Sequence, residues 1–254
     1  MSSKSSPTSK AAGRAAKAAE LRREQEAAER RRRFLMIGGV LAVLVVLLGG
    51  AITASVLIDK KKENDLEKAV AGVGDSKYGL VIGPDDAPHH VVIYEDFLCP
   101  VCGYLEEHSH EELAKAAADG KVQVEYRPFD LLSHNVDADY PIRAAGAFSV
   151  VLDKSGPEVA KKYHDLLYAN QPEESGPYLD DEKLVDLAVE AGAVEADVRP
   201  GIEGGSGEDW VTAATKEALD AGVRGTPTVL VDGQLFHNGD PVDKLTEALL
   251  KEVA

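Results

Sequence analysis

The stretch Tyr94-Glu95-Asp96-Phe97-Leu98-Cys99-Pro100-Val101-Cys102-Gly103 places two cysteines directly after a strongly apolar segment. The apolar segment, residues 91–97, begins with a continuous apolar run that is typical of a strand buried on both faces. Residues 103–119 then carry apolar side chains at helical spacing, and Gly120 is suited to end a helix. Residues 122–126 alternate apolar and polar side chains, which predicts another strand. The sequence therefore predicts a β-α-β unit with both cysteines at the turn from strand to helix.

The two cysteines have the spacing of a redox-active pair. Pro100 suits the first position of a helix because a proline has no N–H group to leave unpaired there. Cys99 then lies at the helix N-terminus, where free N–H groups and the helix dipole favour a thiolate. Cys102 follows about one turn later, close enough to form a disulfide. A disulfide across so short a loop constrains little of the unfolded chain, so the spacing favours redox chemistry over a structural disulfide.

The cysteine pair has two alternative interpretations, a structural disulfide and half of a metal site. The chain contains two cysteines in all, so an intramolecular disulfide must join them. A zinc site needs four ligands, usually including a second pair. His108 and His110 follow on the same helix, but the helical spacing turns the first away from Cys102 and carries the second too far along the axis. His89 and His90 could approach only through the tertiary fold, so we expect no metal.

The rest of the chain beyond residue 78 predicts one α/β domain with an inserted helical lobe. Residues 78–82 form a predicted strand, and a turn-forming Asp232-Gly233 pair separates two more at 227–231 and 234–237. The last segment, 241–252, is a predicted amphipathic helix. Between these units, about residues 130–222, we expect helices and no strand. The expected helices are 138–152, 158–168, 180–190 and 210–221, the last of which begins with Trp210 as a candidate core residue of the lobe.

Two segments resemble the signatures of DsbA-like proteins of the thioredoxin superfamily. Residues 94–103 resemble the active-site segment of that family, and Gly222-Val223-Arg224-Gly225-Thr226-Pro227-Thr228 resembles its loop with a cis-proline before a strand. The resemblance covers residues 78–254, and the order of the two units around a helical insertion agrees with it. It implies a thioredoxin fold, thiol–disulfide oxidoreductase activity and no cofactor.

The resemblance also implies roles for individual residues. Cys99 would be the attacking nucleophile and Cys102 the resolving cysteine. Pro227 would follow a cis peptide bond, and Thr226 would offer its backbone to an extended substrate strand. Pro100 and Val101, between the cysteines, would contact the same substrate. The alternative for Pro227 is an ordinary proline at the start of a strand.

Position 96 and its neighbours leave the redox properties open. Asp96 stands three residues before Cys99, where many relatives carry an aspartate that could accept a proton from Cys102. An acid that only caps the end of the strand is an equal alternative, and Glu95 is a weaker candidate. Ile93 stands where some relatives carry a buried acid. Val101 stands where strongly oxidising relatives often carry a histidine.

The N-terminal quarter of the chain predicts a membrane anchor. Residues 1–33 form a basic head, and residues 34–58 are apolar without a charge. At ~1.5 Å per residue, this run spans more than the ~30 Å hydrocarbon core of a bilayer. We expect a transmembrane helix that contacts lipid. A cleaved signal peptide is the alternative, because small residues at 51–55 would permit cleavage.

Charge predicts the orientation of this anchor. Ten Lys and Arg precede residue 34, whereas Lys60–Lys62 follow the apolar run. The larger excess favours the cytoplasmic side, so the linker 59–77 and the domain 78–254 are expected outside the membrane. Residues 1–62 have a net charge of +8, and the whole chain has −16, so the remainder has −24. So acidic a domain is not expected to bind nucleic acid.

Together, these features predict a membrane-anchored oxidase that acts on exported proteins. Its expected partners are cysteine-containing proteins that are unfolded or still folding, and a membrane redox partner that re-oxidises it. A thiol reductase or isomerase outside the membrane is the first alternative. A non-enzymatic thioredoxin-fold chaperone or complex subunit is the second, although intact Cys99, Cys102 and Pro227 argue against it.

Overall fold

The computed structural model describes residues 77–136, 138–237 and 239–254. The predicted basic head 1–33, the predicted transmembrane helix 34–58 and nearly all of the linker 59–77 lie outside the described residues. Among the residues that the structure does describe, we find no helix with both the length and the apolar character needed to cross a membrane.

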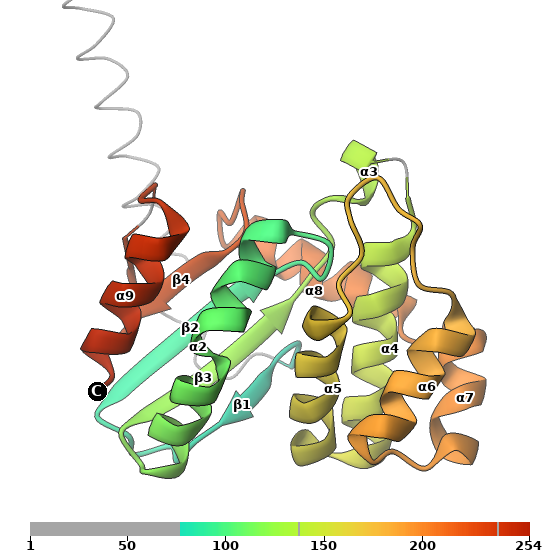
Figure 1. Ribbon diagram of the computed structural model, residues 1–254, viewed down its shortest axis with the longest axis horizontal. Helices are drawn as coiled ribbons and strands as arrows, with labels where there is room; N and C mark the ends of the chain where they lie inside the picture. The colour runs from blue at the N-terminus through green and yellow to red at the C-terminus, as the bar shows by residue number, and fades with distance from the viewer. Residues whose placement is uncertain (1–76, 137, 238) are drawn as a thin grey trace, which may run out of the picture. The chain divides into compact units, whose positions relative to one another are not determined.

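A five-stranded mixed sheet lies at the centre of the domain (Figure 1). Strands β2 and β3 run parallel and are joined by helix α2, while the remaining neighbours pair antiparallel. The spatial order is β1-β3-β2-β4-β5. The strands are β1 Leu80–Ile82, β2 His89–Glu95, β3 Val122–Pro128, β4 Thr228–Val231 and β5 Gln234–Leu235.

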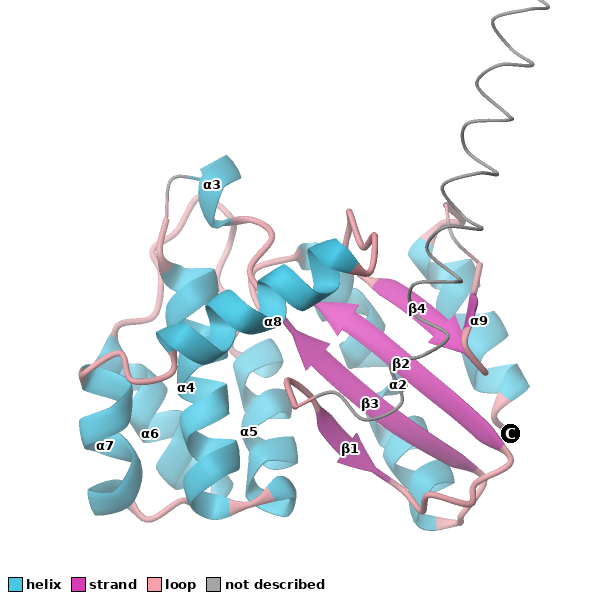
Figure 2. Ribbon diagram, turned by 180° about the vertical axis from the view of Figure 1, so that it is seen from behind, coloured by secondary structure: helices cyan, strands magenta, loops and turns pink. Residues whose placement is uncertain are grey.

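Helices cover both faces of this sheet. Helices α2 (Pro100–Ala118) and α9 (Val242–Glu252) lie on one face, and α8 (Glu208–Asp220) lies on the other (Figures 1 and 2). Along β2, Val91 and Ile93 belong to the core that includes α2, whereas Val92 and Tyr94 belong to the core under α8. All four side chains are buried. The continuous apolar run therefore reflects a strand buried on both faces, and that prediction is confirmed.

The helical lobe is inserted between β3 and β4, as expected. Its helices α4 to α7 pack side by side beside the sheet (Figure 1). Phe148 and Tyr163 of the lobe are fully buried in the same core cluster as Val91, so the lobe and the sheet share one core. The lobe helices are α3 Ser133–Val136, α4 Tyr140–Ser155, α5 Pro157–Ala169, α6 Asp181–Ala191 and α7 Glu195–Glu203.

The structure corrects several sequence-based boundaries. Helices α3 and α7 were not predicted. The sequence of α7 did not indicate a helix because it contains Pro200, and a proline inside a helix removes one backbone hydrogen bond. Its burial of Val198 and Ile202, four residues apart on one face, supplies the packing that holds it. Strand β5 ends at Leu235 rather than at His237. In the described part of residues 130–222 no strand is present, which agrees with the prediction.

Helix α8 packs against the lobe, as expected, and also against the sheet. It lies against lobe helix α4, and its Ala214 and Ala218 belong to the cluster on the sheet that contains Leu230. Trp210, near its start, is half-buried and makes an edge-to-face contact with Tyr78 at a centroid distance of 5.8 Å. Trp210 therefore packs between the lobe and the sheet instead of within the lobe core.

Candidate active site

The two cysteines lie where β2 gives way to α2. Cys99 has an extended backbone and is the N-cap of the helix, and Pro100 is its first helical residue. Cys99 is 6% exposed and Cys102 is 1% exposed. Both thiols are free. The geometry at the helix start is therefore the one predicted, with Cys99 the more accessible of two largely buried thiols.

The loop before β4 meets Cys99 because β4 pairs with β2. Tyr94 lies opposite Thr228 in this antiparallel pair, so the loop just before β4 lies beside the residues just after β2. The Sγ atom of Cys99 donates a hydrogen bond to the carbonyl oxygen of Thr226, at 3.4 Å. The peptide bond between Thr226 and Pro227 is cis, as expected for this bond. The roles of the two residues toward a substrate stay predictions.

A small hollow adjoins this loop. It has a volume of about 160 Å³, and its lining includes Val101, Thr226, Pro227, Leu235 and Phe236. The Val101 side chain is 43% exposed, which is unusual for an apolar residue in this domain. His237 and Asp240 also line the hollow, so it combines apolar and polar groups. A partly open surface of this kind beside a reactive thiol suits the binding of an extended segment.

The surroundings of the two cysteines shift their pKa values in opposite directions. The Cys102 thiol, the Thr226 side chain and the N–H groups at the helix start donate to the Cys99 thiolate. These hydrogen bonds outweigh burial and lower the pKa of Cys99 to about 6. Burial, and then the neighbouring Cys99 and the charge of Glu95, raise the pKa of Cys102 well above its ordinary value. Cys99 therefore has the properties of an attacking thiolate, and Cys102 those of a buried thiol that holds its proton.

The carboxylate of Asp96 is buried and fully engaged by backbone N–H groups. Its Oδ1 accepts from Leu98 at 2.8 Å, and its Oδ2 accepts from Leu131 at 2.9 Å and from Leu132 at 3.0 Å. Burial raises the pKa of Asp96 to about 6, although the three hydrogen bonds oppose this shift. These contacts join the end of β2 to the start of the lobe. They fit the capping alternative, and the role of Asp96 as a proton acceptor stays a prediction.

The lobe contributes residues to the site that the sequence analysis did not select. The side-chain amide of Gln171 donates to the carbonyl oxygens of Phe97 and Cys99, both at 3.0 Å. The Tyr168 hydroxyl donates to the carbonyl oxygen of Asp96 at 3.4 Å. Tyr168 lies in the last turn of α5 and Gln171 follows two residues after that helix, and nothing in their local sequence marks them. They hold the active-site turn against the lobe.

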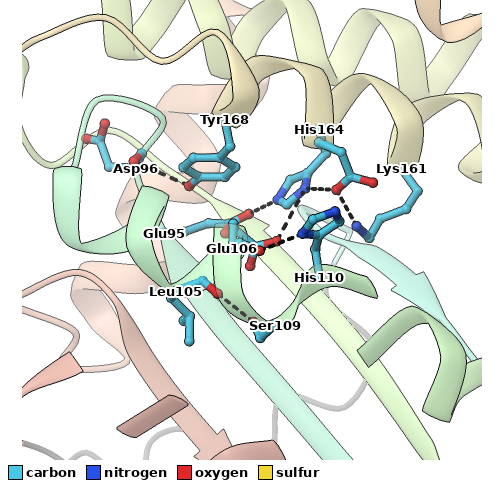
Figure 3. Close-up of polar contacts among 10 residues, drawn as sticks. Glu95, Asp96, Leu105, Glu106, Ser109, His110, Lys161, His164 and Tyr168 are labelled. Carbon is cyan, nitrogen blue, oxygen red and sulfur yellow. Dashed lines mark hydrogen bonds and ion pairs between the residues drawn. The ribbon is translucent and has the colours of Figure 1, made fainter. Parts of the chain in front are cut away.

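A buried ionic cluster lies beside the cysteine helix. The Nε2 atom of His164 is 2.6 Å from Oε1 of Glu95, and its Nδ1 atom is 3.2 Å from Asp165 and 3.9 Å from Glu106. Figure 3 shows the carboxylates of Glu95 and Glu106 converging on this imidazole. Lys161 pairs with Asp165 at the edge of the cluster. Only one feature of the sequence pointed to this cluster, namely that a second acid, Glu95, stands beside Asp96 at the end of the apolar strand. Glu95 was considered there only as a weaker candidate for the proton acceptor.

Part of this cluster has the residue types of a metal site. Ligand atoms of Glu95, Glu106 and His164 lie within 4.8 Å of one another. Both ring nitrogens of His164 already have hydrogen-bond partners, Glu95 on one side and Asp165 on the other. The imidazole would have to give up one of these bonds to ligate a metal.

The histidines that follow Cys102 on α2 do not turn toward it. The Nδ1 atoms of His108 and His110 bond to carbonyl oxygens of their own helix, those of Tyr104 and Glu106, respectively. In the described part of the chain, these two histidines and Cys102 do not form a ligand set.

Comparison with known proteins decides the family. The family model described as thioredoxin matches residues 75–251, well over half of the chain. The chain belongs to the thioredoxin family. Its similarity to curated relatives includes disulfide bond formation protein D of Bacillus subtilis, at 26% identity over 188 residues, which cover 73% of this chain and 82% of that protein.

Solved structures place this thioredoxin-family protein beside the Dsb oxidoreductases. It resembles the reduced disulfide bond oxidoreductase DsbG of Mycobacterium tuberculosis, with 30% identity, a TM-score of 0.59, and coverage of 74% of this chain and 91% of that one. It also resembles oxidised DsbA of the same organism, with 29% identity, a TM-score of 0.57, and coverage of 69% and 92%. The thioredoxin-family chain is thus a thiol–disulfide oxidoreductase of the DsbA type.

Proposed function

We propose that this oxidoreductase is an oxidase that donates its disulfide to exported proteins while they fold. The stabilised thiolate of Cys99 carries this proposal. Hydrogen bonds from Cys102, Thr226 and the helix start lower the pKa of Cys99 to about 6. A dithiol whose reduced form is stabilised gives up its disulfide readily, so these contacts favour oxidation of a client.

The client would bind across the hollow beside Cys99. An unfolded segment carries apolar side chains and unpaired backbone groups, and the hollow offers Val101, Leu235 and Phe236 for the former. The loop at Thr226 precedes strand β4 and supports pairing with an extended client strand. This arrangement favours clients that are still unfolded around their cysteines, because a folded protein cannot extend such a segment.

The proposed location is the outer side of the cell membrane. It rests on the sequence: the apolar run 34–58 as an anchor, and the ten basic residues before it on the cytoplasmic side. Disulfides persist in such a compartment. Each turnover leaves the cysteines reduced, so the oxidase also needs an electron acceptor. We propose a membrane redox partner for this role, since an anchored enzyme stays within its reach.

Trapping the thiols in intact cells tests the direction of electron flow. Cells that produce the full chain are treated with acid and then with a maleimide that adds mass to each free thiol. An oxidase should have Cys99 and Cys102 mostly in the disulfide form, and the purified full chain in detergent should speed the oxidative refolding of reduced ribonuclease. Mostly reduced cysteines would favour a reductase or isomerase. Equal client folding by a variant in which serine replaces both cysteines would favour a non-enzymatic chaperone.

A protease that cannot cross membranes tests the location. On intact cells in which the outer face of the membrane is accessible, it should digest the domain 78–254 and spare the N-terminal head. Digestion only after lysis would reverse the proposed orientation. A purified protein that begins near Ser55 would show that the apolar run is a cleaved signal peptide.

A further inference from the structure

A second depression, separate from the hollow beside Thr226, begins at the cysteine turn. Pro100 borders this depression, whereas the next residue, Val101, borders the hollow. The thiol of Cys99 bonds to Thr226 in the hollow, and its carbonyl oxygen accepts from Gln171, which lines the second depression. Cys99 therefore has the hollow next to its thiol and the second depression next to its carbonyl group.

Two helices that pack against each other, α2 and α5, form the walls of this depression, which we call the α2–α5 groove. Its lining residues recur at intervals of three and four on each helix, so one side of each helix faces the groove. Its volume is about 920 Å³, at the upper end of the about 300–1,000 Å³ that is usual for ligand pockets. The lining includes Gly103, Tyr104 and Glu107 of α2, Lys162, Leu166 and Ala169 of α5, and Glu190 of α6.

Small and apolar side chains shape the part of the groove near the cysteines. A Cβ atom at position 103 would lie 2.3 Å from Oε1 of Gln171, so Gly103 lets the Gln171 side chain lie against the cysteine helix. On the other wall, Ala169 is exposed, and its methyl group leaves space in front of it. Tyr104 and Leu166 are half-buried and offer apolar surface. The groove can therefore take both the main chain and the side chains of a peptide segment.

The groove also carries two carboxylates that pair with no other described residue. Glu107 comes from α2 and Glu190 from α6, and both are exposed. The lysine of the groove, Lys162, already pairs with Glu158 at 3.1 Å. Asp165, which also lines the groove, has its own cationic partners on α5. The charge of Glu107 and Glu190 is therefore left to attract a cation from outside the domain.

We infer that the α2–α5 groove binds the client segment on one side of its reacting cysteine and prefers a basic side chain there. The inference rests on the proposed function, in which a client lies in the hollow at Thr226 while its cysteine meets Cys99. Such a segment must continue past the cysteine turn, and the groove begins at that turn with Pro100. This continuity assigns the groove to the client.

The length of α2 sets the spacing between the client's cysteine and its basic residue. Glu107 follows Cys99 by eight residues, and each helical residue rises ~1.5 Å, so the two lie about 12 Å apart along the helix axis. An extended chain covers this length in about four residues. An arginine or lysine about four positions from the client's cysteine would therefore reach Glu107.

The test follows the oxidation of short reduced peptides by the oxidised full chain in detergent. Each peptide has a pair of cysteines and one charged residue, Arg or Glu, at that spacing before or after the pair. Its first thiolate attacks Sγ of Cys99 and leaves the electron pair of the broken disulfide on Cys102. Its second thiolate closes the peptide disulfide and releases Cys99. Two electrons thus pass to the enzyme, one peptide proton ends on Cys102, and the other goes to solvent.

The measured quantity is each peptide's rate divided by the rate with dithiothreitol, which has no segment to place in the groove. For one of the two placements, the Arg peptide should react about three- to tenfold faster than the Glu peptide in low salt. Because exposed charges are screened, the two rates should converge in high salt. Joint replacement by Glu107→Gln and Glu190→Gln should abolish most of the difference. Glu112→Gln, an exposed change on α2 outside the groove, should retain it.

A second pair of variants tests the groove without changing its charge. Ala169→Trp should fill the groove and slow both peptides of the sensitive placement. Its control is Ala196→Trp, which adds the same side chain at an exposed position of α7 and should leave the rates unchanged.

Equal rates for the Arg and Glu peptides in both placements would overturn the inference. An Arg preference that survives the loss of both carboxylates would also overturn it, because the overall acidic charge of the domain would then be the cause. If Ala169→Trp slowed only re-oxidation of the chain in cells, the groove would belong to the redox partner. If it only dissociated a dimer of the full chain, the groove would belong to a second copy. The proposed function fails separately: a chain found mostly reduced in cells would contradict the oxidase direction and leave these peptide rates unchanged.

Discussion

The Sγ atom of Cys99 donates its hydrogen bond to the carbonyl oxygen of Thr226, a residue 127 positions further along the chain. In the reduced protein with Cys99 protonated, this bond occupies the backbone group that the resemblance assigns to a client strand. The contact joins the thiol at the start of α2 to the loop before β4, and it exists because β4 pairs with β2. Cys99 and not Cys102 therefore lies at the surface where a client would bind.

Replacing Cys102 with serine should trap clients. Cys99 would still attack a client disulfide, but no second thiol would release the mixed disulfide. Non-reducing gels of cells that produce Cys102→Ser should show adducts of high molecular mass, and these should disappear when dithiothreitol reduces the mixed disulfides. The Cys99→Ser variant is the control and should give none. If Cys99→Ser traps clients and Cys102→Ser does not, the roles of the two cysteines are reversed.

The alkylation of Cys99 should depend on pH with a midpoint near 6. The thiolate reacts, and it forms as the pH rises through the lowered pKa of Cys99. The thiolate stabilises the folded, reduced protein fully above the ordinary cysteine pKa of 9.0, and this stabilisation is lost progressively as the pH falls from there to about 6. Each unit by which the pKa is lowered corresponds to about 1.36 kcal/mol. Iodoacetamide rates across the pH range give the midpoint.

The Cys102→Ala variant provides the control for that measurement. The largest influence on the Cys99 thiolate is the hydrogen bond from Cys102. Removing it should move the alkylation midpoint to higher pH, whereas Cys102→Ser, which keeps a donor, should move it less. An unchanged midpoint in Cys102→Ala would show that the helix start alone stabilises the thiolate.

Replacing Asp96 with asparagine should destabilise the domain. The two carboxylate oxygens accept three backbone N–H groups in a buried position, and the asparagine amide offers only one acceptor oxygen. We expect the free energy of unfolding to fall by about 2–4 kcal/mol, since buried donors lose charged acceptors. Denaturant unfolding measures it, with the exposed Asp86→Asn as the control. A variant of native stability that exchanges thiols slowly would instead support a role in proton transfer.

Replacing Val101 with histidine should make the protein more oxidising. Val101 is 43% exposed beside Cys99 and offers neither a charge nor a hydrogen-bond donor. A histidine there would add a donor and a partial positive charge near the thiolate, and so lower the pKa of Cys99 further. Equilibration with glutathione should give a higher reduction potential. The native value should lie between the roughly −270 mV of thioredoxin and the roughly −120 mV of the strongest oxidants.

Replacing Gln171 with leucine should loosen the active-site turn. Its amide donates to the carbonyl oxygens of Phe97 and Cys99, and leucine cannot replace these bonds. The free energy of unfolding should fall by about 1–3 kcal/mol. Hydrogen exchange at the N–H groups of residues 97–103 should rise more than in the rest of the sheet. Asn170→Leu, which removes a hydrogen bond within the lobe, is the matched control.

The sheet and the cysteine turn could be predicted because their signals are local. The apolar run at Val91, the alternation at Val122 and the turn pair Asp232-Gly233 each depend on neighbouring residues. Helix α7 had no such signal, since Pro200 interrupts its pattern and the packing of Val198 and Ile202 against the lobe holds it. Its prediction would have required the tertiary structure.

The same distinction applies to the site. Cys99, Cys102 and Thr226 lie in recognisable motifs, whereas the partner of Glu95 is His164, 69 residues away in the inserted lobe. A lone histidine within a helix gives no sign that it faces a strand end. The hydrogen bond from His164 offsets the free-energy cost of burying Glu95. Only the tertiary fold brings these two residues together, so the spacing of the sequence could not reveal the pair.

Helix α5 and the residues that directly follow it supply three of the lobe's contacts with the active site. His164, Tyr168 and Gln171 follow one another at intervals of four and three residues, and each bonds to the segment that runs from Glu95 to Cys99. A chimera that takes its lobe from a relative would therefore change the electrostatics of the cysteines unless it kept these three positions. The outer surface of the lobe makes none of these contacts, so substitutions there can accumulate while these three positions stay fixed.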